Sequence, residues 1–434
     1  MDKGEIRHIL KQNEYKLKLD NTAIIHMASK NKKWTNMFRL SMTLIDDVER
    51  EILQKALNNI AGRFPTVLAS VHKGFFWYYQ QPVVKTPSVL EDAILLKPMT
   101  NKELAKCAIR VLYSKKTIHL EFFHSITDGK GGIVFLKSLA YEYLKIKENI
   151  SIPKSKDILN SNDIPLKEEI QDAYNKIESQ TKSFSIKESN KKVYQFKNIK
   201  NTQLNTQKYI IDIQELKPLA NSLNVTLTIL ISAIIIKSII NLQKKELNIK
   251  KQSVVKIFLP INLRNLFKIN TLRNFVLYIK PEINPNEDEY TLHKIVKSIK
   301  EQMDKGLETE NLKARIQKNV SLQNNPVVKL LPLFLKEVIL KKSFIYSEKT
   351  TSLTVSNLGV INVPKEMDNY IESFNCLLNT RSETPYNCGI ISYKDKLYMN
   401  FIRNIEDPLL ETEISNLLNK LCVKYKVDNG EYKI

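Results

Sequence analysis

The sequence is poor in the residues that build disulfide frameworks and metal sites. Its 434 residues include 4 cysteines and 6 histidines, all widely spread, and no two cysteines form a Cys-x-x-Cys pair. So few cysteines do not make a disulfide scaffold in a chain of this length, and a structural metal needs clustered ligands. We expect no metal, no permanently bound cofactor, and packed free thiols at the four cysteine positions: Cys107, Cys376, Cys388 and Cys422.

Nucleic-acid-binding signatures are also missing. Lysine and arginine number 67 against 46 aspartates and glutamates, a net charge of +21, which could attract nucleic acid, an anionic membrane or an acidic substrate. The lysines are scattered along the whole chain, however, and there is no zinc-finger spacing, RNA-binding aromatic motif or arginine-rich arm. We interpret the charge as general composition and expect no nucleic-acid partner.

Long apolar runs are scarce. Residues 1–16 contain none, so we expect no secretory signal and a cytoplasmic protein. Residues 225–242 are very apolar, but Lys237 interrupts them, whereas a spanning helix needs about 20 predominantly apolar residues. This segment predicts a buried core helix capped by Thr226 or Thr228, and no transmembrane segment.

A second apolar segment, 326–342, carries lysines among large aliphatic side chains. Such a segment can lie on a membrane surface or pack its apolar side against its own protein. We favour packing against its own protein.

Length and pattern indicate two lobes. A hydrophobic content of 43% supports a well-buried interior, and 434 residues exceed one ordinary core. Alternating helical and strand patterns predict an α/β or α+β fold. Residues 151–203 are polar and poor in large aliphatics, so we expect a first lobe at 1–150, a crossover linker at 151–203 and a second lobe at 204–434.

Periodicity locates the elements of both lobes. Alternating apolar residues predict strands, and apolar residues at three- and four-residue intervals predict helices. In the first lobe the expected strands are 37–44, two strands around a turn at Lys73-Gly74, 108–113 and 117–123. In the second lobe we expect a strand followed by a short helix from 208, and a strand from 254 that ends in a polar turn. The expected helices are 48–64 and the segment after Gly131-Gly132.

The most informative local pattern is the string His124-Ser-Ile-Thr-Asp128-Gly129. It lies between a strand and an amphipathic helix, so His124 is expected at a strand end. An imidazole there can remove a proton from an attacking hydroxyl or amine near neutral pH. Gly129 is expected to supply a backbone conformation that other residues resist, while Asp128 can brace the loop by pairing with an arginine.

The segment FFHSITDGKGGIVFLKSL resembles the active-site segment of the chloramphenicol-acetyltransferase-like superfamily, which also contains condensation domains. Within it the chain is most similar to the bacterial branch called alcohol acetyltransferase. Three further segments resemble the family in the expected order: RLSMTLIDDVEREILQKALNNIAGRFPTV, LPINLRNLF with the later RNFVLY, and TTSLTVSNLGVINVP. The likeness runs from about Trp34 to the end, apart from the crossover.

This resemblance implies two lobes, each a mixed sheet flanked by helices, with a tunnel between them. It implies an acyltransferase in which the acceptor attacks a thioester directly while His124 acts as the general base. It also implies that Asp128 is structural and pairs with Arg264, although an arginine at a turn could equally lie on the surface. Ser356 and Asn357 match the residues that bind the developing oxyanion, and Thr354 is an alternative.

Three differences from the family's sequence pattern narrow the expected function. Condensation domains carry two adjacent histidines, but here the first position is Phe123. The plant enzymes' Asp-Phe-Gly-Trp-Gly segment is absent, and no carrier-protein domain is fused to the chain. We expect acyl-coenzyme A as co-substrate and an alcohol or amine as acceptor. Acyl-carrier protein as donor, aided by the basic charge, and a non-catalytic binding protein are the alternatives. Cys388 is a poor nucleophile candidate because no histidine lies near it in the sequence.

Overall fold

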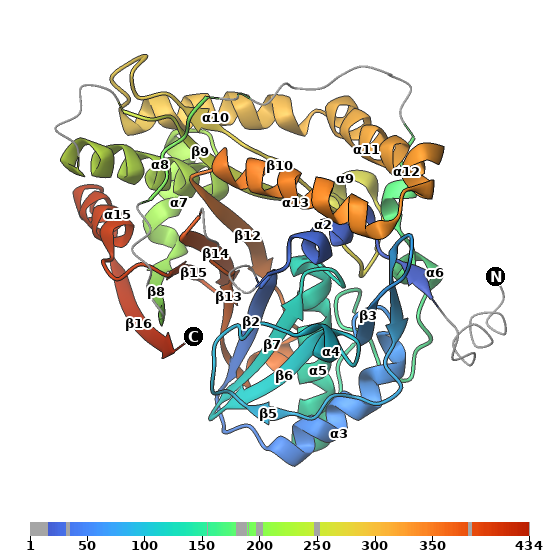
Figure 1. The fold of residues 1–434 in the computed structure, drawn as a ribbon. Helices are drawn as coiled ribbons and strands as arrows, with labels where there is room; N and C mark the ends of the chain where they lie inside the picture. Colours follow the sequence, from blue (N-terminus) through green and yellow to red (C-terminus); the bar gives the residue numbers. More distant parts are fainter. Residues whose placement is uncertain are drawn as a thin grey trace.

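The computed structural model describes residues 16–31, 35–153, 155–178, 189, 191–196, 203–246, 252–380 and 384–433. They form two lobes of sheet and helix (Figure 1). The mixed α/β class expected from the sequence is confirmed. Residues 1–15, on which the absence of a secretory signal was judged, and Trp34 lie outside the described part, so the cytoplasmic location stays a prediction.

The first lobe is built on a five-stranded sheet. The order across the sheet is β13 (Ile371–Leu377), β2 (Met37–Leu44), β7 (Thr117–Phe123), β6 (Ile109–Ser114) and β5 (Leu90–Glu91). The strands β2 and β7 have the bounds that alternation predicted, and β6 is displaced by one residue from its predicted range. Neighbours are antiparallel except β5 and β6. Beside it, β1 (Leu17–Lys18), β4 (Tyr78–Pro82) and β3 (Ala69–Lys73) make a small antiparallel sheet, confirming the predicted hairpin.

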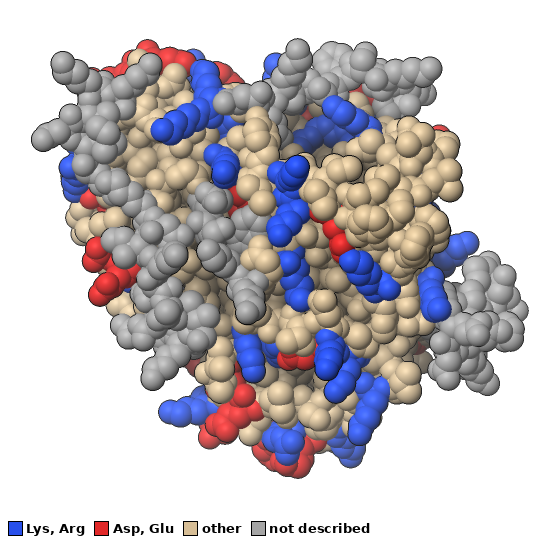
Figure 2. All heavy atoms as spheres, in the orientation of Figure 1, with Lys and Arg blue, Asp and Glu red and all other residues tan. Residues whose placement is uncertain are grey.

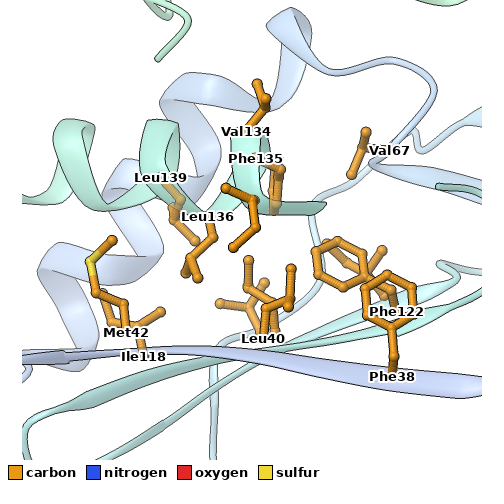
Figure 3. Packing of buried hydrophobic residues seen from close by; sticks show 14 of the residues in the cluster. Phe38, Leu40, Met42, Val67, Ile118, Phe122, Val134, Phe135, Leu136 and Leu139 are labelled. Carbon is orange, nitrogen blue, oxygen red and sulfur yellow. The ribbon is translucent and has the colours of Figure 1, made fainter. Parts of the chain in front are cut away.

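Two helices cover one face of the larger sheet, α3 (Arg50–Ile60) and α5 (Gly129–Glu148). The apolar side chains of α5 point toward those of the strands, with Phe135 and Leu136 above Leu40 and Phe122 (Figure 3). Phe135 and Leu139 are four residues apart and lie on the same side of the helix. Every residue of α5 from 131 to 144 is buried, so the helix is enclosed on its other sides as well. The first lobe also contains α2 (Asn21–Ser29), the short helix α4 (Asn101–Leu104) and a single 3₁₀ turn, η1 (Ala61–Arg63).

The second lobe contains a larger mixed sheet. Its strands run in the order β10 (Val276–Ile279), β9 (Val255–Asn262), β12 (Leu353–Ile361), β14 (Tyr386–Tyr393), β15 (Lys396–Arg403), β8 (Gln203–Asp212) and β16 (Tyr425–Lys433), with β11 (Glu282–Ile283) paired to β9. Only β12 is parallel to its neighbours, β9 and β14. β12 also reaches the first lobe, because its Leu358 lies against Gly129 at the start of α5.

Helices pack on the outer face of this sheet. The most apolar is α8 (Leu227–Glu246), which contacts α10 (Leu292–Leu307) and α15 (Leu409–Lys420). Thr226 caps it, since its hydroxyl accepts a hydrogen bond from the Ile229 amide at 3.3 Å. Among the described residues, this helix alone has the length and apolarity to cross a membrane, and 72% of that apolar window is buried in the protein. The expected buried core helix is confirmed.

The remaining helices connect these layers. They are α7 (Ile213–Ser222), α9 (Arg264–Phe267), α11 (Thr309–Asn324), α12 (Pro326–Leu330), α13 (Leu333–Lys349) and α14 (Lys365–Asp368). The described parts of the crossover hold only α6 (Lys167–Ile170) and the 3₁₀ turn η2 (Ala173–Lys176). Glu169 ties this crossover to the first lobe through a buried ion pair with Arg63 at 2.6 Å.

The expectation of a packed thiol is wrong for Cys422, which is exposed. Two expectations about the elements also need correction. Segment 326–342 packs only partly against the protein: α12 has no buried residue, and α13 buries only Leu333 and Glu348 although it contacts α2. Apolar side chains lie on the outer side of α13 as well as on its inner side. A helix that packs against the protein on one side cannot bury both sets. The second correction concerns the lobes: β13 lies within 204–434 but pairs with β2 of the first lobe.

The two sheets touch where β13 crosses β14. A Cβ atom added to Gly389 of β14 would stand 2.3 Å from the backbone oxygen of Cys376 in β13. Gly389 therefore permits a backbone-to-backbone contact that a larger residue excludes. This contact joins the sheets of the two lobes.

We predict that Gly389→Ala lowers the free energy of unfolding by about 1–3 kcal/mol, because the added methyl group must push one sheet away from the other. The matched control is Gly62→Ala, since an added Cβ there has no atom within 4 Å. Chemical unfolding of both variants measures the effect. Equal stability of the two variants would contradict the prediction.

Candidate active site between the two lobes

His124 follows the last residue of β7, at the boundary between the lobes. Its backbone N–H donates to the Asn36 carbonyl at 2.9 Å, which fixes the chain just beyond the strand. Its ring nitrogen Nδ1 lies 3.2 Å from Oδ1 of Asn274, a residue of the second lobe. Because an amide oxygen only accepts hydrogen bonds, Nδ1 carries the proton of this bond. The neutral ring then keeps its lone pair on Nε2, which is the arrangement a general base needs.

A further contact fixes the orientation of the Asn274 amide. Its Nδ2 lies 3.5 Å from Oδ2 of Asp20, whose carboxylate form accepts this hydrogen bond. Burial raises the pKa of that carboxyl to about 7, so this form prevails above that pH. The amide nitrogen therefore faces Asp20, and the amide oxygen faces His124. Asn274 is fully buried, so its side chain is confined to this position.

Two aromatic neighbours hold the imidazole ring in place. The ring of His26, from α2, stacks on that of His124 with centroids 4.3 Å apart and planes at 12°. Phe38, from β2, lies against it at 4.9 Å. These contacts leave His124 half-buried, with its orientation restricted from the first lobe as well as the second. No sequence pattern pointed to His26, because its contact with His124 depends on how α2 packs against the end of β7.

Asp128 is the N-cap of α5 and also binds the second lobe. Its Oδ1 accepts from the backbone N–H groups of Lys130 and Gly131, both at 3.1 Å. Its Oδ2 accepts from Arg264 Nη1 and from the backbone N–H of Phe275, both at 2.8 Å. One carboxylate thus starts the helix that follows the His124 loop and joins that loop to the other lobe. None of these contacts involves His124.

All three side-chain nitrogens of Arg264 donate hydrogen bonds. Its Nε donates to the Thr271 carbonyl at 2.8 Å and its Nη2 to the Arg273 carbonyl at 2.7 Å. It is 6% exposed and Asp128 is 2% exposed. The structure therefore brings together the two residues that the family resemblance paired, and Arg264 is not a surface residue. The guanidinium also stabilises the turn that carries Asn274, because the two accepting carbonyls precede that residue.

Gly129 has a different role from the one expected. Its backbone does not adopt a left-handed conformation, so conformational freedom is not its function. A Cβ at this position would stand 2.4 Å from Cδ2 of Leu358 on β12. At Gly131 an added Cβ would stand 2.4 Å from the Leu272 carbonyl oxygen. The glycines are therefore explained by the close approach of the two lobes at the start of α5.

Strand β12 lines the other side of the site. Asn357 is committed to structure: its amide nitrogen donates to the Thr228 hydroxyl at 2.9 Å, and its Oδ1 accepts from the Gly359 N–H at 2.8 Å. The β12–β14 register shifts just after Asn357, and Gly359 has a φ of +77°. The Ser-Asn-Leu-Gly segment is thus a bulge within a strand that continues to Ile361, rather than a turn at its end.

A cavity of about 400 Å³ lies between the lobes at this point. Its lining includes His124, Asp128 and Gly129 of the first lobe and Ser356 and Thr354 of the second. The helix α13 contributes Leu340, Ser343, Phe344 and Ser347 to the same cavity, while Lys130 and Lys137 are the only lysines of the described part that line it. The residues predicted to act together therefore share one cavity.

Two other kinds of site come into question in the described part of the chain, a metal site and a cysteine nucleophile. No group of three or more His, Cys, Asp or Glu side chains there could hold a metal ion. Cys388 is fully buried, and burial raises the pKa of its thiol well above the ordinary value. A thiol in this state is a poor nucleophile, so its packing role in β14 is sufficient to explain it.

Comparison with known proteins gives a match in structure. No family model matches the chain, and no curated protein matches it in sequence. The trichothecene 15-O-acetyltransferase TRI3 of Fusarium sporotrichioides is 12% identical over 94% of this chain and 94% of its own, with a TM-score of 0.62. TRI101 of F. graminearum, solved with coenzyme A and T-2 mycotoxin, is 11% identical over 94% and 99%, with a TM-score of 0.64. This chain has their fold.

The same fold occurs in proteins named for a different task. The first condensation domain of the calcium-dependent antibiotic synthetase, solved with a substrate analogue, is 11% identical over 94% of this chain and 97% of its own, with a TM-score of 0.60. The two-lobed fold that the sequence resemblance implied is thus confirmed. At these identities the likeness concerns the fold, and the bacterial alcohol acetyltransferase branch stays a prediction.

We predict that Asp128→Ala and Arg264→Ala each lower the free energy of unfolding by about 3–5 kcal/mol, because each leaves a buried charge without its partner. The double variant should lose less than the sum of the two. Equilibrium unfolding of the four proteins in this cycle measures the coupling.

The matched control is the ion pair of Asp288 and Lys294, whose side chains are 46% and 50% exposed. Alanine at either control position should cost about 1 kcal/mol or less. Strictly additive losses at Asp128 and Arg264 would show that the two residues do not stabilise one another.

Proposed function

We propose that this protein is an acyltransferase that moves an acyl group from acyl-coenzyme A to an alcohol or amine acceptor. The observation that carries the proposal is His124: its Nδ1 is bonded to Asn274, its ring is held between His26 and Phe38, and it lines the cavity between the lobes. The fold shared with acetyltransferases supports the same reaction class. We infer an alcohol as the first acceptor to test, from the sequence resemblance.

In the proposed reaction, Nε2 of His124 removes the proton from the acceptor hydroxyl or amine as that atom attacks the thioester carbonyl. A tetrahedral intermediate forms, its carbon–sulfur bond then breaks, and the thiolate leaves. The proton held by His124 passes to that thiolate, so the enzyme returns to its starting state. No covalent bond to the protein is formed.

Ser356 is the strongest candidate for stabilising the oxyanion. It lines the cavity with His124, and its hydroxyl is a hydrogen-bond donor of the kind that such a site requires. The amide of Asn357 is already engaged by Thr228 and Gly359, so Asn357 shapes the strand instead. Thr354 also lines the cavity and is the second candidate.

A carrier-protein donor is the second candidate function. Condensation domains share this fold, and the net charge of +21 favours association with acidic partners. Phe123, fully buried, occupies the position where condensation domains carry their first histidine. This difference leads us to place acyl-coenzyme A first. A binding protein without activity is the outcome that an absence of transfer would indicate.

We predict that His124→Ala lowers the transfer rate by about 10²–10⁴-fold, because a general base contributes a factor of this size. Acetyl-, medium-chain and long-chain acyl-coenzyme A are incubated with a panel of alcohols and amines, and products are measured by mass spectrometry. His293→Ala is the control, since His293 is exposed on α10. Turnover by His124→Ala close to that of the unchanged protein would contradict the mechanism.

We also predict that coenzyme A raises the melting temperature, because a ligand that binds only the folded state stabilises it by mass action. Added salt should weaken this effect, since charge pairs with the coenzyme phosphates are screened over about 8–10 Å. The His124→Ala variant should show the same shift, which separates binding from chemistry. No shift at millimolar coenzyme A, together with capture of an acidic acyl-carrier protein, would favour the second function.

A further inference from the structure

The surface formed by α12, α13 and the loop between β3 and β4 exposes large apolar side chains. Six of them define what we call the apolar face, and they are between 52% and 75% exposed: Phe75, Val327, Leu330, Phe334, Val338 and Ile339. Isolated exposed apolar residues are ordinary, but a contiguous group of this kind marks an interaction site.

Contacts join the three segments into one surface. The Leu333 N–H donates to the Phe75 carbonyl at 2.9 Å, and the Lys336 ammonium donates to the Phe76 carbonyl at 2.9 Å. Lys73, at the end of β3, forms an ion pair with Glu337 at 2.6 Å. The loop is thus fixed against the first turns of α13. Phe334 and Val338 are one helical turn apart on that helix and lie on the same side.

The two sides of α13 have different neighbours. Leu340 and Phe344 line the cavity between the lobes, and the helix packs against α2. Large apolar side chains occur on both sides of α13, and such side chains are ordinarily buried. Here the outer side is exposed, and nothing within the described part of the chain covers it. The apolar face and the candidate active site are therefore opposite sides of one helix.

The charged side chains of the segment that carries the apolar face are mostly lysines. From Pro326 to Lys349 the chain contains five lysines, two glutamates and no arginine. Glu337 is engaged by Lys73 and by the Tyr78 hydroxyl, and Glu348 is 5% exposed. Figure 2 shows the area over α12 and α13 as largely uncharged, with basic side chains and some acidic atoms beside it. No acidic side chain of this segment is left to offset its lysines.

This composition fits a lipid surface better than a protein partner. Helices that lie on membranes combine large apolar side chains with lysines that attract anionic headgroups. Protein interfaces are instead depleted in lysine and enriched in arginine. We propose that the apolar face and its lysines dock this protein onto an anionic lipid bilayer. Docking does not require the proposed transferase activity, but it places the cavity beside the headgroups, because α13 borders both.

The test is flotation with vesicles of phosphatidylcholine alone and of phosphatidylcholine mixed with phosphatidylglycerol. The full chain should float with the anionic vesicles and not with the neutral ones, and added salt should reduce binding. The variant Phe334→Asn with Ile339→Asn should bind at least tenfold more weakly. The variant Lys341→Gln with Lys342→Gln should lose about fivefold for each lysine removed.

Matched controls use exposed positions elsewhere. Val84→Asn replaces a side chain that is 95% exposed, and Lys115→Gln with Lys116→Gln removes an adjacent exposed pair at the turn between β6 and β7. Both controls should bind anionic vesicles as the unchanged protein does, and all variants should keep its melting temperature. Equal binding by the Phe334 variant and the Val84 control would overturn the proposal. So would failure to float combined with self-association that depends on Phe334, since a second copy would then cover the apolar face.

Discussion

The carboxylate of Asp128 is the interaction on which the site depends. One oxygen caps α5, and the other binds Arg264 and the Phe275 N–H of the second lobe. A buried carboxylate is costly unless every lone pair is used, and here both oxygens have donors. The same group therefore fixes where α5 begins, where the His124 loop ends and how closely the lobes approach.

Asn274 shows how the second lobe completes the site. His124 comes from the first lobe, yet the tautomer of its ring is set by an amide from the second. Arg264 holds the turn that precedes Asn274 while it binds Asp128. The base and its orienting group are therefore linked through the same pair of charges. A shift between the lobes would alter the chemistry of the imidazole as well as the shape of the cavity.

Much of the fold could be predicted from the sequence because short-range periodicity determines it. The strand over 37–44, the strand that ends before His124 and the core helix beyond Thr226 all follow from spacing. The partners of His124 could not be found in this way, because His26 and Asn274 reach it only through tertiary packing. The apolar segment around α13 was misjudged for a related reason: periodicity identifies an apolar side, but not whether the rest of the chain covers it.

The placement of β13 has a consequence for how molecules reach the cavity. This strand leaves the second lobe's part of the chain, joins β2 of the first, and lies against β14 across the boundary. The lobes therefore cannot separate widely without breaking either the pairing of β13 with β2 or its contact with β14. Ligands would then have to reach the cavity without a wide separation of the lobes. Selectivity would then arise from the dimensions of the cavity between the lobes, since a bulky molecule could not rely on the lobes opening.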